Sequence, residues 1–132
     1  MADLKAVKLF AGLPARELKQ IEKELRVIEQ PAGHNLTVRG ASGIGFMIIT
    51  EGTATVTTSS GHTRSLGPGD SFGEMALLDH EGRSATITAD TAVTLATIPE
   101  WNFRSFLKAH PDVAYRLLQV LSQRVRQAER EA

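Results

Sequence analysis

The chain has 132 residues and a formal net charge of zero, with fifteen basic and fifteen acidic side chains, a length typical of one domain, expected to span 1–132. Because the charges balance, the composition argues against non-specific binding to nucleic acid, which needs an excess of Lys and Arg. The lack of cysteine excludes disulfides and thiolate chemistry, and the lack of a signal peptide or of an apolar run of roughly 20 residues predicts a cytoplasmic protein.

Residues 1–25 are predicted to form an N-terminal helical motif. Asp3 is placed to cap a short helix, and Gly12 suits the position that follows its C-terminus. Pro14 suits the first turn of a second helix. The second helix is expected to bury an apolar face formed by Leu18, Ile21, Leu25 and Ile28.

From residue 26 to residue 98 the hydrophobic period changes from that of a helix to that of strands. Short runs alternate apolar and polar side chains, as around Ala54 and Val56, and Gly and Pro separate the runs. Residues 46–49 are all apolar, which predicts a strand buried on both faces, and Gly61 indicates a hairpin turn. About eight such strands favour a sandwich, barrel or jelly roll, and hence a mainly β member of the α+β class.

Residues 99–132 return to helix. Pro99 opens one helix, and Pro111 ends it and starts a longer one that is predicted to reach Glu129. The longer helix carries an apolar stripe of Ala114, Leu117, Leu118, Leu121, Val125 and Ala128. Packing of this stripe on the β-rich body is the simplest interpretation, and a lid over a ligand or a helix-to-helix dimer contact are the alternatives.

One segment breaks the strand pattern, with the sequence GDSFGEMALL at residues 69–78 followed by RSAT at 83–86. Its glycines allow tight turns and a close approach to a ligand. A helical turn after Gly73 would present free backbone N–H groups to an anion, and Arg83 can hold a phosphate through two parallel hydrogen bonds. The carboxylate of Glu74 would repel an anion, so its presence indicates a ligand that also offers a hydroxyl, such as a sugar phosphate.

This segment resembles the phosphate-binding cassette of the cyclic nucleotide-binding domain family, which includes kinase A regulatory subunits, cyclic nucleotide-gated channels and bacterial catabolite activator proteins. The resemblance extends over almost the whole chain. It implies an eight-stranded β-roll at 26–98, with the cassette and its short helix at 69–86. The N-terminal helices would precede this roll in the sequence, and the helices named B and C in the family would follow it at 99–132.

The resemblance also implies a set of ligand-binding residues, namely Phe72, Gly73, Glu74, Met75, Ala76, Leu77, Arg83, Ser84 and Ala85. In this reading Glu74 accepts a hydrogen bond from the ribose 2′-OH, and Arg83 pairs with the exocyclic phosphate oxygens. The backbone N–H groups of Ala76 and Ala85 bind the phosphate as well. Gly73 and Met75 would shape the pocket wall.

Each of these residues also has a purely structural interpretation. Ser71 and Glu74 match a capping box, and Arg83 alone would suit a surface ion pair with Asp79 or Glu81. The joint spacing of Glu74, Arg83 and the glycines favours ligand binding. No nucleophile–base arrangement or pair of catalytic carboxylates is visible, so we expect no enzyme. The histidines lie in predicted turns without metal-ligand spacing, so neither a metal nor a cofactor is expected; they are His34, His62, His80 and His110.

The resemblance implies a sensor that binds a cyclic mononucleotide, with cAMP favoured over cGMP, and signals through its C-terminal helices. Leu77 would move against the B helix, with Phe103 as its contact. Ser84 leaves the base open, because a hydroxyl after the arginine can favour guanine and yet occurs in several bacterial cAMP binders. The C helix would cap the purine with Tyr115, Leu118 and Leu121.

Two other functions stay open. The chain could be a fragment or relative of a catabolite-activator-type transcription regulator, but a helix-turn-helix would have to follow the last helix, so we expect no DNA binding. A small jelly-roll enzyme is the weaker alternative. The partners expected of a sensor are the cyclic nucleotide, a protein effector and a second copy bound through the C-terminal helix.

Overall fold

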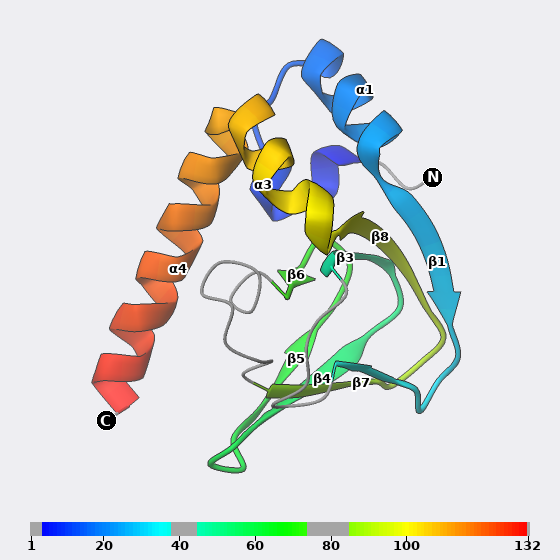
Figure 1. The fold of residues 1–132 in the computed structure, drawn as a ribbon. Helices are drawn as coiled ribbons and strands as arrows, with labels where there is room; N and C mark the ends of the chain where they lie inside the picture. Colours follow the sequence, from blue (N-terminus) through cyan, green and yellow to red (C-terminus); the bar gives the residue numbers. More distant parts are fainter. Residues whose placement is uncertain (1–3, 38–44, 74–84, 132) are drawn as a thin grey trace.

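The computed structural model describes residues 4–37, 45–73 and 85–131. Two four-stranded antiparallel sheets form a β-roll. Most of the helical elements gather at one end of it, and the C-terminal helix runs from that end down beside the roll (Figure 1). The strands are β1 Arg26–Gln30, β2 Asn35–Thr37, β3 Gly45–Glu51, β4 Ala54–Thr58, β5 Thr63–Leu66, β6 Ser71–Phe72, β7 Ala85–Ala89 and β8 Val93–Pro99. The predicted eight-stranded, mainly β architecture is confirmed.

The strand order is β1-β8-β3-β6 in the first sheet and β2-β7-β4-β5 in the second. Strand β3 explains how the two sheets share one interior. Its Phe46 and Ile48 lie in the hydrophobic core beneath the helices, whereas Met47 and Ile49 lie in the core between the sheets. Successive side chains of a strand point to opposite faces, so an unbroken apolar run fits this position. The prediction that residues 46–49 are buried on both faces is confirmed.

Strands β4 and β7 follow the simpler alternating rule. Ala54 and Val56 point into the core, as do Ala85 and Ile87 on the neighbouring strand. The predicted hairpin turn between β4 and β5 is present: the Thr58 N–H donates to the His62 carbonyl over 2.9 Å, and Gly61 has φ of 86°. A positive φ suits glycine because other residues meet steric strain there.

The N-terminal motif differs from the sequence prediction. Two short 3-10 helices, η1 Leu4–Ala6 and η2 Lys8–Phe10, replace the single short helix, because Val7 between them has an extended backbone. Helix α1, Ala15–Glu24, follows with Pro14 at its N-cap rather than in its first turn. Ile28 lies on β1 and not on this helix. The predicted capping residue Asp3 is outside the described residues.

Helices α3, Glu100–Ala109, and α4, Pro111–Glu131, begin where the prolines predict. The predicted apolar stripe of α4 is divided in the structure. Leu117 is buried and Leu121 packs on the core, whereas Leu118 and Val125 are 64% and 56% exposed. Helix α4 meets the body near its start and then runs past the roll to the C-terminus, so its outer side faces solvent (Figure 1). None of the described helices combines the length and apolar character that a membrane span requires.

Candidate functional site

A pocket of about 390 Å³ opens between the roll and helix α4. Its walls come from η2, β5, the turn before β6, and the inner side of α4. The residues that line it are Lys8, Leu9, Arg64, Leu66, Gly69, Asp70, Ser71, Val120, Gln123, Arg124 and Gln127. Three of the four charged side chains among them are cationic, so the described walls favour a ligand that carries negative charge.

The floor of the pocket is a tight turn that leads into β6. The Gly67 N–H donates to Asp70 Oδ2 over 2.9 Å, and the Asp70 N–H donates to the Gly67 carbonyl over 3.0 Å. The turn is fixed to β3 by two further bonds, from the Gly69 N–H to the Ile49 carbonyl and from the Ile49 N–H to the Asp70 carbonyl. These bonds satisfy the turn's backbone groups and hold its two glycines in place.

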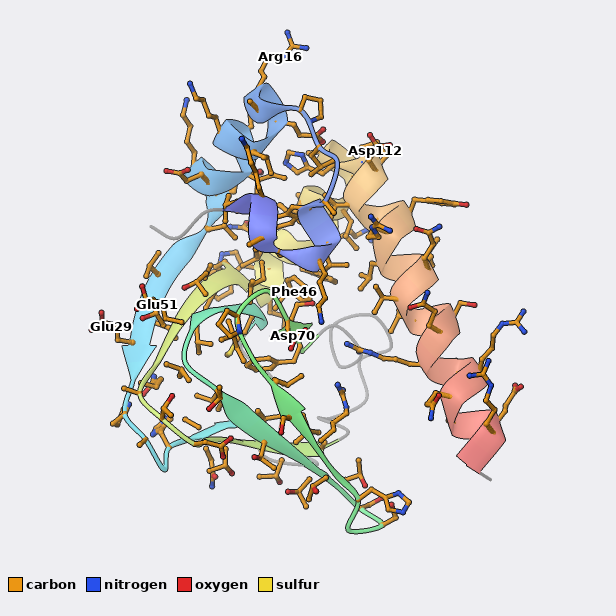
Figure 2. All side chains as sticks on the ribbon, turned by 180° about the vertical axis from the view of Figure 1, so that it is seen from behind. Arg16, Glu29, Phe46, Glu51, Asp70 and Asp112 are labelled. Atoms are coloured by element: carbon orange, nitrogen blue, oxygen red, sulfur yellow. The ribbon has the colours of Figure 1, made fainter. Side chains whose placement is uncertain are left out.

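The same turn is joined to the N-terminal motif. The Lys8 N–H donates to the Gly69 carbonyl over 3.2 Å, and the Lys8 ammonium lies 2.5 Å from Asp70 Oδ1. Partial burial of Asp70 works to raise the pKa of its carboxyl. The hydrogen bonds from Lys8 and Gly67, with the charges of Lys8 and Arg64, outweigh it and lower the pKa below its ordinary value. Asp70 therefore stays ionised beneath η2 (Figure 2).

Three of the predicted ligand-binding residues can be placed. Phe72 lies on β6 opposite Met47, Gly73 follows it with φ of 99°, and Ala85 begins β7. Phe72 and Ala85 belong to the same hydrophobic core between the sheets. The remaining predicted residues, Glu74, Met75, Ala76, Leu77, Arg83 and Ser84, lie outside the described residues, as does His80.

The inner wall formed by α4 carries other residues than those predicted to cap a purine. Tyr115 and Leu118, expected to cap a purine, are 65% and 64% exposed and do not line the pocket. Leu121 packs on the core beneath the helices instead. The helical rotation of about 100° per residue points a different set, Val120, Gln123, Arg124 and Gln127, toward the pocket.

Sequence reasoning missed this polar wall because it followed the apolar stripe alone. Arg124, which is half-buried, lines the pocket from the same wall. Lys8 and Arg64 carried no signal at all, since each is an ordinary charge in a short element. Among the described residues, no group of three or more His, Asp or Glu side chains is arranged to hold a metal ion.

The family model described as "Cyclic nucleotide-binding domain" matches residues 27–110, well over half of the chain. The chain belongs to the cyclic nucleotide-binding domain family. The match runs from β1 through the pocket floor and the predicted cassette to the end of α3. The resemblance seen in residues 72–77 and 83–85 is therefore confirmed at the level of the family.

Two curated relatives and one solved structure illustrate the membership. A cyclic nucleotide-gated potassium channel of Rhizobium etli is 38% identical over 109 residues, which cover 83% of this chain and 30% of the channel. A CRP-like cAMP-activated global transcriptional regulator of Mycobacterium tuberculosis is 27% identical over 123 residues, covering 89% of this chain and 55% of the regulator. The chain thus spans about a third to a half of the length of these relatives.

The solved structure is that of the Thermus thermophilus catabolite activator protein. It superposes with a TM-score of 0.85 at 29% sequence identity, covering 94% of this chain and 61% of that protein. The β-roll with its flanking helices is therefore shared with a catabolite activator.

Proposed function

We propose that this chain binds a cyclic mononucleotide in the pocket between the roll and α4, and that it acts as a ligand-responsive regulatory module rather than as an enzyme. One observation carries the proposal. The residues with the family's cassette pattern run from Phe72 to Ala85, and these two residues belong to one hydrophobic core. A pocket with cationic walls lies beside β6. A ligand with a phosphate and a hydroxyl suits both features.

The phosphate is assigned to the cassette. Arg83 pairs with its exocyclic oxygens, and the backbone N–H groups of Ala76 and Ala85 donate to it, while Glu74 accepts from the ribose 2′-OH. A bidentate guanidinium is the strongest neutral-pH partner for a phosphate that a side chain supplies. The positive field of Lys8 and Arg64 supports the approach of the anion.

The purine is assigned to the α4 side of the pocket, and adenine is favoured over guanine. Gln123 and Gln127 line this wall, and an amide side chain matches the adjacent acceptor and donor of adenine. A relative that covers 89% of the chain is a cAMP-activated regulator, which supports the same base. Contact between the purine and α4 would favour one position of this helix, and the change would pass to an effector protein.

Titration calorimetry of the nucleotide-free chain with cAMP and cGMP, using 5′-AMP as the control, tests the proposal. We expect saturable one-to-one binding of the cyclic nucleotides, tighter for cAMP, and none of 5′-AMP. The Arg83→Ala variant should weaken binding by about 10²–10⁴-fold, because two charge-assisted bonds of about 1.5–3 kcal/mol each are lost. Arg126→Ala, an exposed charge on α4, is the matched control.

Unchanged affinity in Arg83→Ala would refute the site assignment. Hydrolysis of the cyclic nucleotide during incubation with the chain would refute the proposal that the chain is not an enzyme.

The second candidate function is that of a fragment or relative of a transcription regulator. It is favoured by the fold shared with the catabolite activator and by an exposed apolar stripe on α4, formed by Tyr115, Leu118 and Val125, which we call the outer stripe. Such a stripe suits helix-to-helix contact with a second copy of the chain. We propose a cytoplasmic homodimer in which this domain itself makes no specific DNA contact. A gel shift with duplex DNA, with and without cAMP, is expected to show no complex.

A further inference from the structure

His110 is the only buried polar side chain among the described residues, with 3% of its surface exposed. It lies at the junction of α3 and α4, where its N–H donates to the Phe106 carbonyl and its own carbonyl accepts from the N–H groups of Val113 and Ala114. The ring packs against Phe106, with the two ring centroids 4.8 Å apart. Its position is therefore fixed by both helices.

Both ring nitrogens face carboxylates of α1. Nδ1 lies 3.2 Å from Glu17 Oε1, and Nε2 lies 2.7 Å from Glu24 Oε2. The three residues, which we call the His110 clamp, thus connect α1 to a junction about ninety residues later in the chain, since the pairs are 93 and 86 positions apart. Glu17 and Glu24 lie on one face of α1, two turns apart.

The number of protons on the ring decides how many of these contacts are hydrogen bonds. An ionised carboxylate only accepts, and a neutral imidazole has one N–H to donate, whereas an imidazolium has two. With both carboxylates ionised, only the imidazolium satisfies both contacts. Loss of one ring proton leaves a carboxylate oxygen facing a bare nitrogen lone pair, which is unfavourable at the buried ring, although the side chains of Glu17 and Glu24 are themselves 22% and 42% exposed.

Within residues 4–37, 45–73 and 85–131, the charged groups in contact with the ring are those of α1. On α1 the groups facing the ring are Glu17 and Glu24, and α3 contributes the uncharged ring of Phe106. The charged neighbours in sequence, Lys108 and Asp112, are exposed to solvent. The ring also lies between the C-terminus of α3 and the N-terminus of α4, whose dipoles act on it in opposite senses.

We propose that the His110 clamp is a proton-dependent lock, which holds α1 against the α3–α4 junction while the ring is an imidazolium and releases it when the ring loses a proton. Helix α4 begins at this junction and forms one wall of the pocket. The position of that wall, and with it the affinity for a ligand that touches it, would therefore depend on pH. The clamp itself stands on the geometry alone, and only its link to the ligand rests on the proposed function.

Urea unfolding between about pH 5.5 and about pH 8.5, the range in which imidazoles titrate, tests the clamp. Because both contacts of the clamp need the imidazolium, the proposal predicts that stability is greatest at the acidic end and falls as the pH rises. One linked proton changes the ratio of folded to unfolded chain by up to about tenfold per pH unit. His110→Gln should lack this component, while the exposed His34 and His62 are present in both proteins.

A second pair of variants keeps the test usable if His110→Gln fails to fold. Glu24→Gln retains an acceptor for the Nε2 proton but removes the charge, so the pH-dependent component should shrink. Glu22→Gln, an exposed position of the same helix, should match the wild type. Nitrogen-15 spectra of the His110 ring at the acidic end should show two protonated nitrogens. Parallel pH profiles of wild type and Glu24→Gln, or a ring with one proton at the acidic end, would overturn the proposal.

The link to the ligand is measured separately by cAMP titration at the two ends of the same pH range. We expect binding about fivefold tighter at the acidic end in the wild type and in Glu22→Gln, a difference that Glu24→Gln removes. An equal pH dependence in all three proteins would overturn the link. If cAMP binds at neither pH, the proposed function fails, and the unfolding and ring spectra still decide on the clamp.

Discussion

The ammonium of Lys8 lies 2.5 Å from a carboxylate oxygen of Asp70, although the two residues are 62 positions apart in the chain. Together with the bond from the Lys8 N–H to the Gly69 carbonyl, this ion pair holds η2 against the turn that precedes β6. Strand β6 leads directly to Gly73 and the predicted cassette. The N-terminal motif is therefore joined, through this turn and β6, to the start of the predicted cassette.

The Asp70→Asn variant is expected to lower stability at neutral pH by about 1 kcal/mol or less, because the lost ion pair is partly exposed. The wild type should also lose stability as the pH falls. The pKa of Asp70 is lowered in the folded chain, so its contribution is present above the ordinary pKa of an aspartate and disappears as the pH drops through the lowered value.

Urea unfolding between about pH 3 and about pH 7 measures both effects. In Asp70→Asn the decline on the acidic side should be shallower than in the wild type. Glu29→Gln, an exposed carboxylate at the roll's outer edge (Figure 2), is the matched control and should keep the wild-type slope. An acid limb of equal steepness in Asp70→Asn and the wild type would contradict the role given to the ion pair.

The close approach of η2 to the turn leaves no room for a side chain at Gly69. A Cβ atom there would lie 2.6 Å from the Ala6 carbonyl oxygen, and the residue has φ of 94°. Gly61 has a similar φ of 86° but no atom within 4 Å of the same position. We expect Gly61→Ala to cost about 1–2 kcal/mol through backbone strain, and Gly69→Ala to cost more, about 3 kcal/mol or above, because a clash with backbone is added.

Chemical denaturation of the two glycine variants beside the wild type provides the comparison. The difference between them isolates the contact between η2 and the turn, since the conformational term is nearly common to both. Equal losses of stability would mean that η2 moves aside without cost, and that its contact with the turn is not rigid.

Much of the fold could be predicted because burial imposes a period on the sequence. The alternation around Ala54 and Val56 and the unbroken run at residues 46–49 each follow from the number of faces a strand buries. The prolines at 99 and 111 set the helix boundaries for a local steric reason. The cassette pattern could be recognised because its residue types lie close together in sequence. Its described residues Phe72 and Ala85 belong to one hydrophobic core.

The features that escaped prediction depend on contacts between distant segments. His110 follows a helix and precedes a proline, which reads as a solvated turn, yet α1 buries it between two carboxylates. The pocket wall on α4 escaped for a different reason. An amphipathic helix shows which residues are apolar, but not which angle it presents to the body, and here the polar residues Gln123 and Gln127 line the pocket.

Arg124 is predicted to contribute to ligand affinity from the α4 wall. It lines the pocket, and a guanidinium can hydrogen-bond either to a phosphate or to an acceptor on a purine. We expect Arg124→Ala to weaken cyclic nucleotide binding by about 10–100-fold, the equivalent of one charge-assisted hydrogen bond of about 1.5–3 kcal/mol. Calorimetric titration measures the change.

Arg126→Ala removes the same charge from an exposed position two residues away and is the control for net charge. Its affinity should stay within about twofold of the wild type, since an exposed charge interacts weakly. Equal losses in Arg124→Ala and Arg126→Ala would assign the effect to the overall field of the helix. Unchanged affinity in Arg124→Ala would remove α4 from the binding site.

The outer stripe of α4 is predicted to join two copies of the chain. Tyr115, Leu118 and Val125 lie within about 80° of one another around the helix and are all more than half exposed. Analytical ultracentrifugation should find a dimer of the wild type, and the double variant Leu118→Glu with Val125→Glu should be a monomer, because burying two carboxylates opposes the contact. Gln119→Glu, exposed beside the stripe, should remain a dimer. If the wild type sediments as a monomer, the outer stripe does not join two copies and is instead a contact for an effector protein. The charged variants would then abolish effector binding but would still bind the nucleotide.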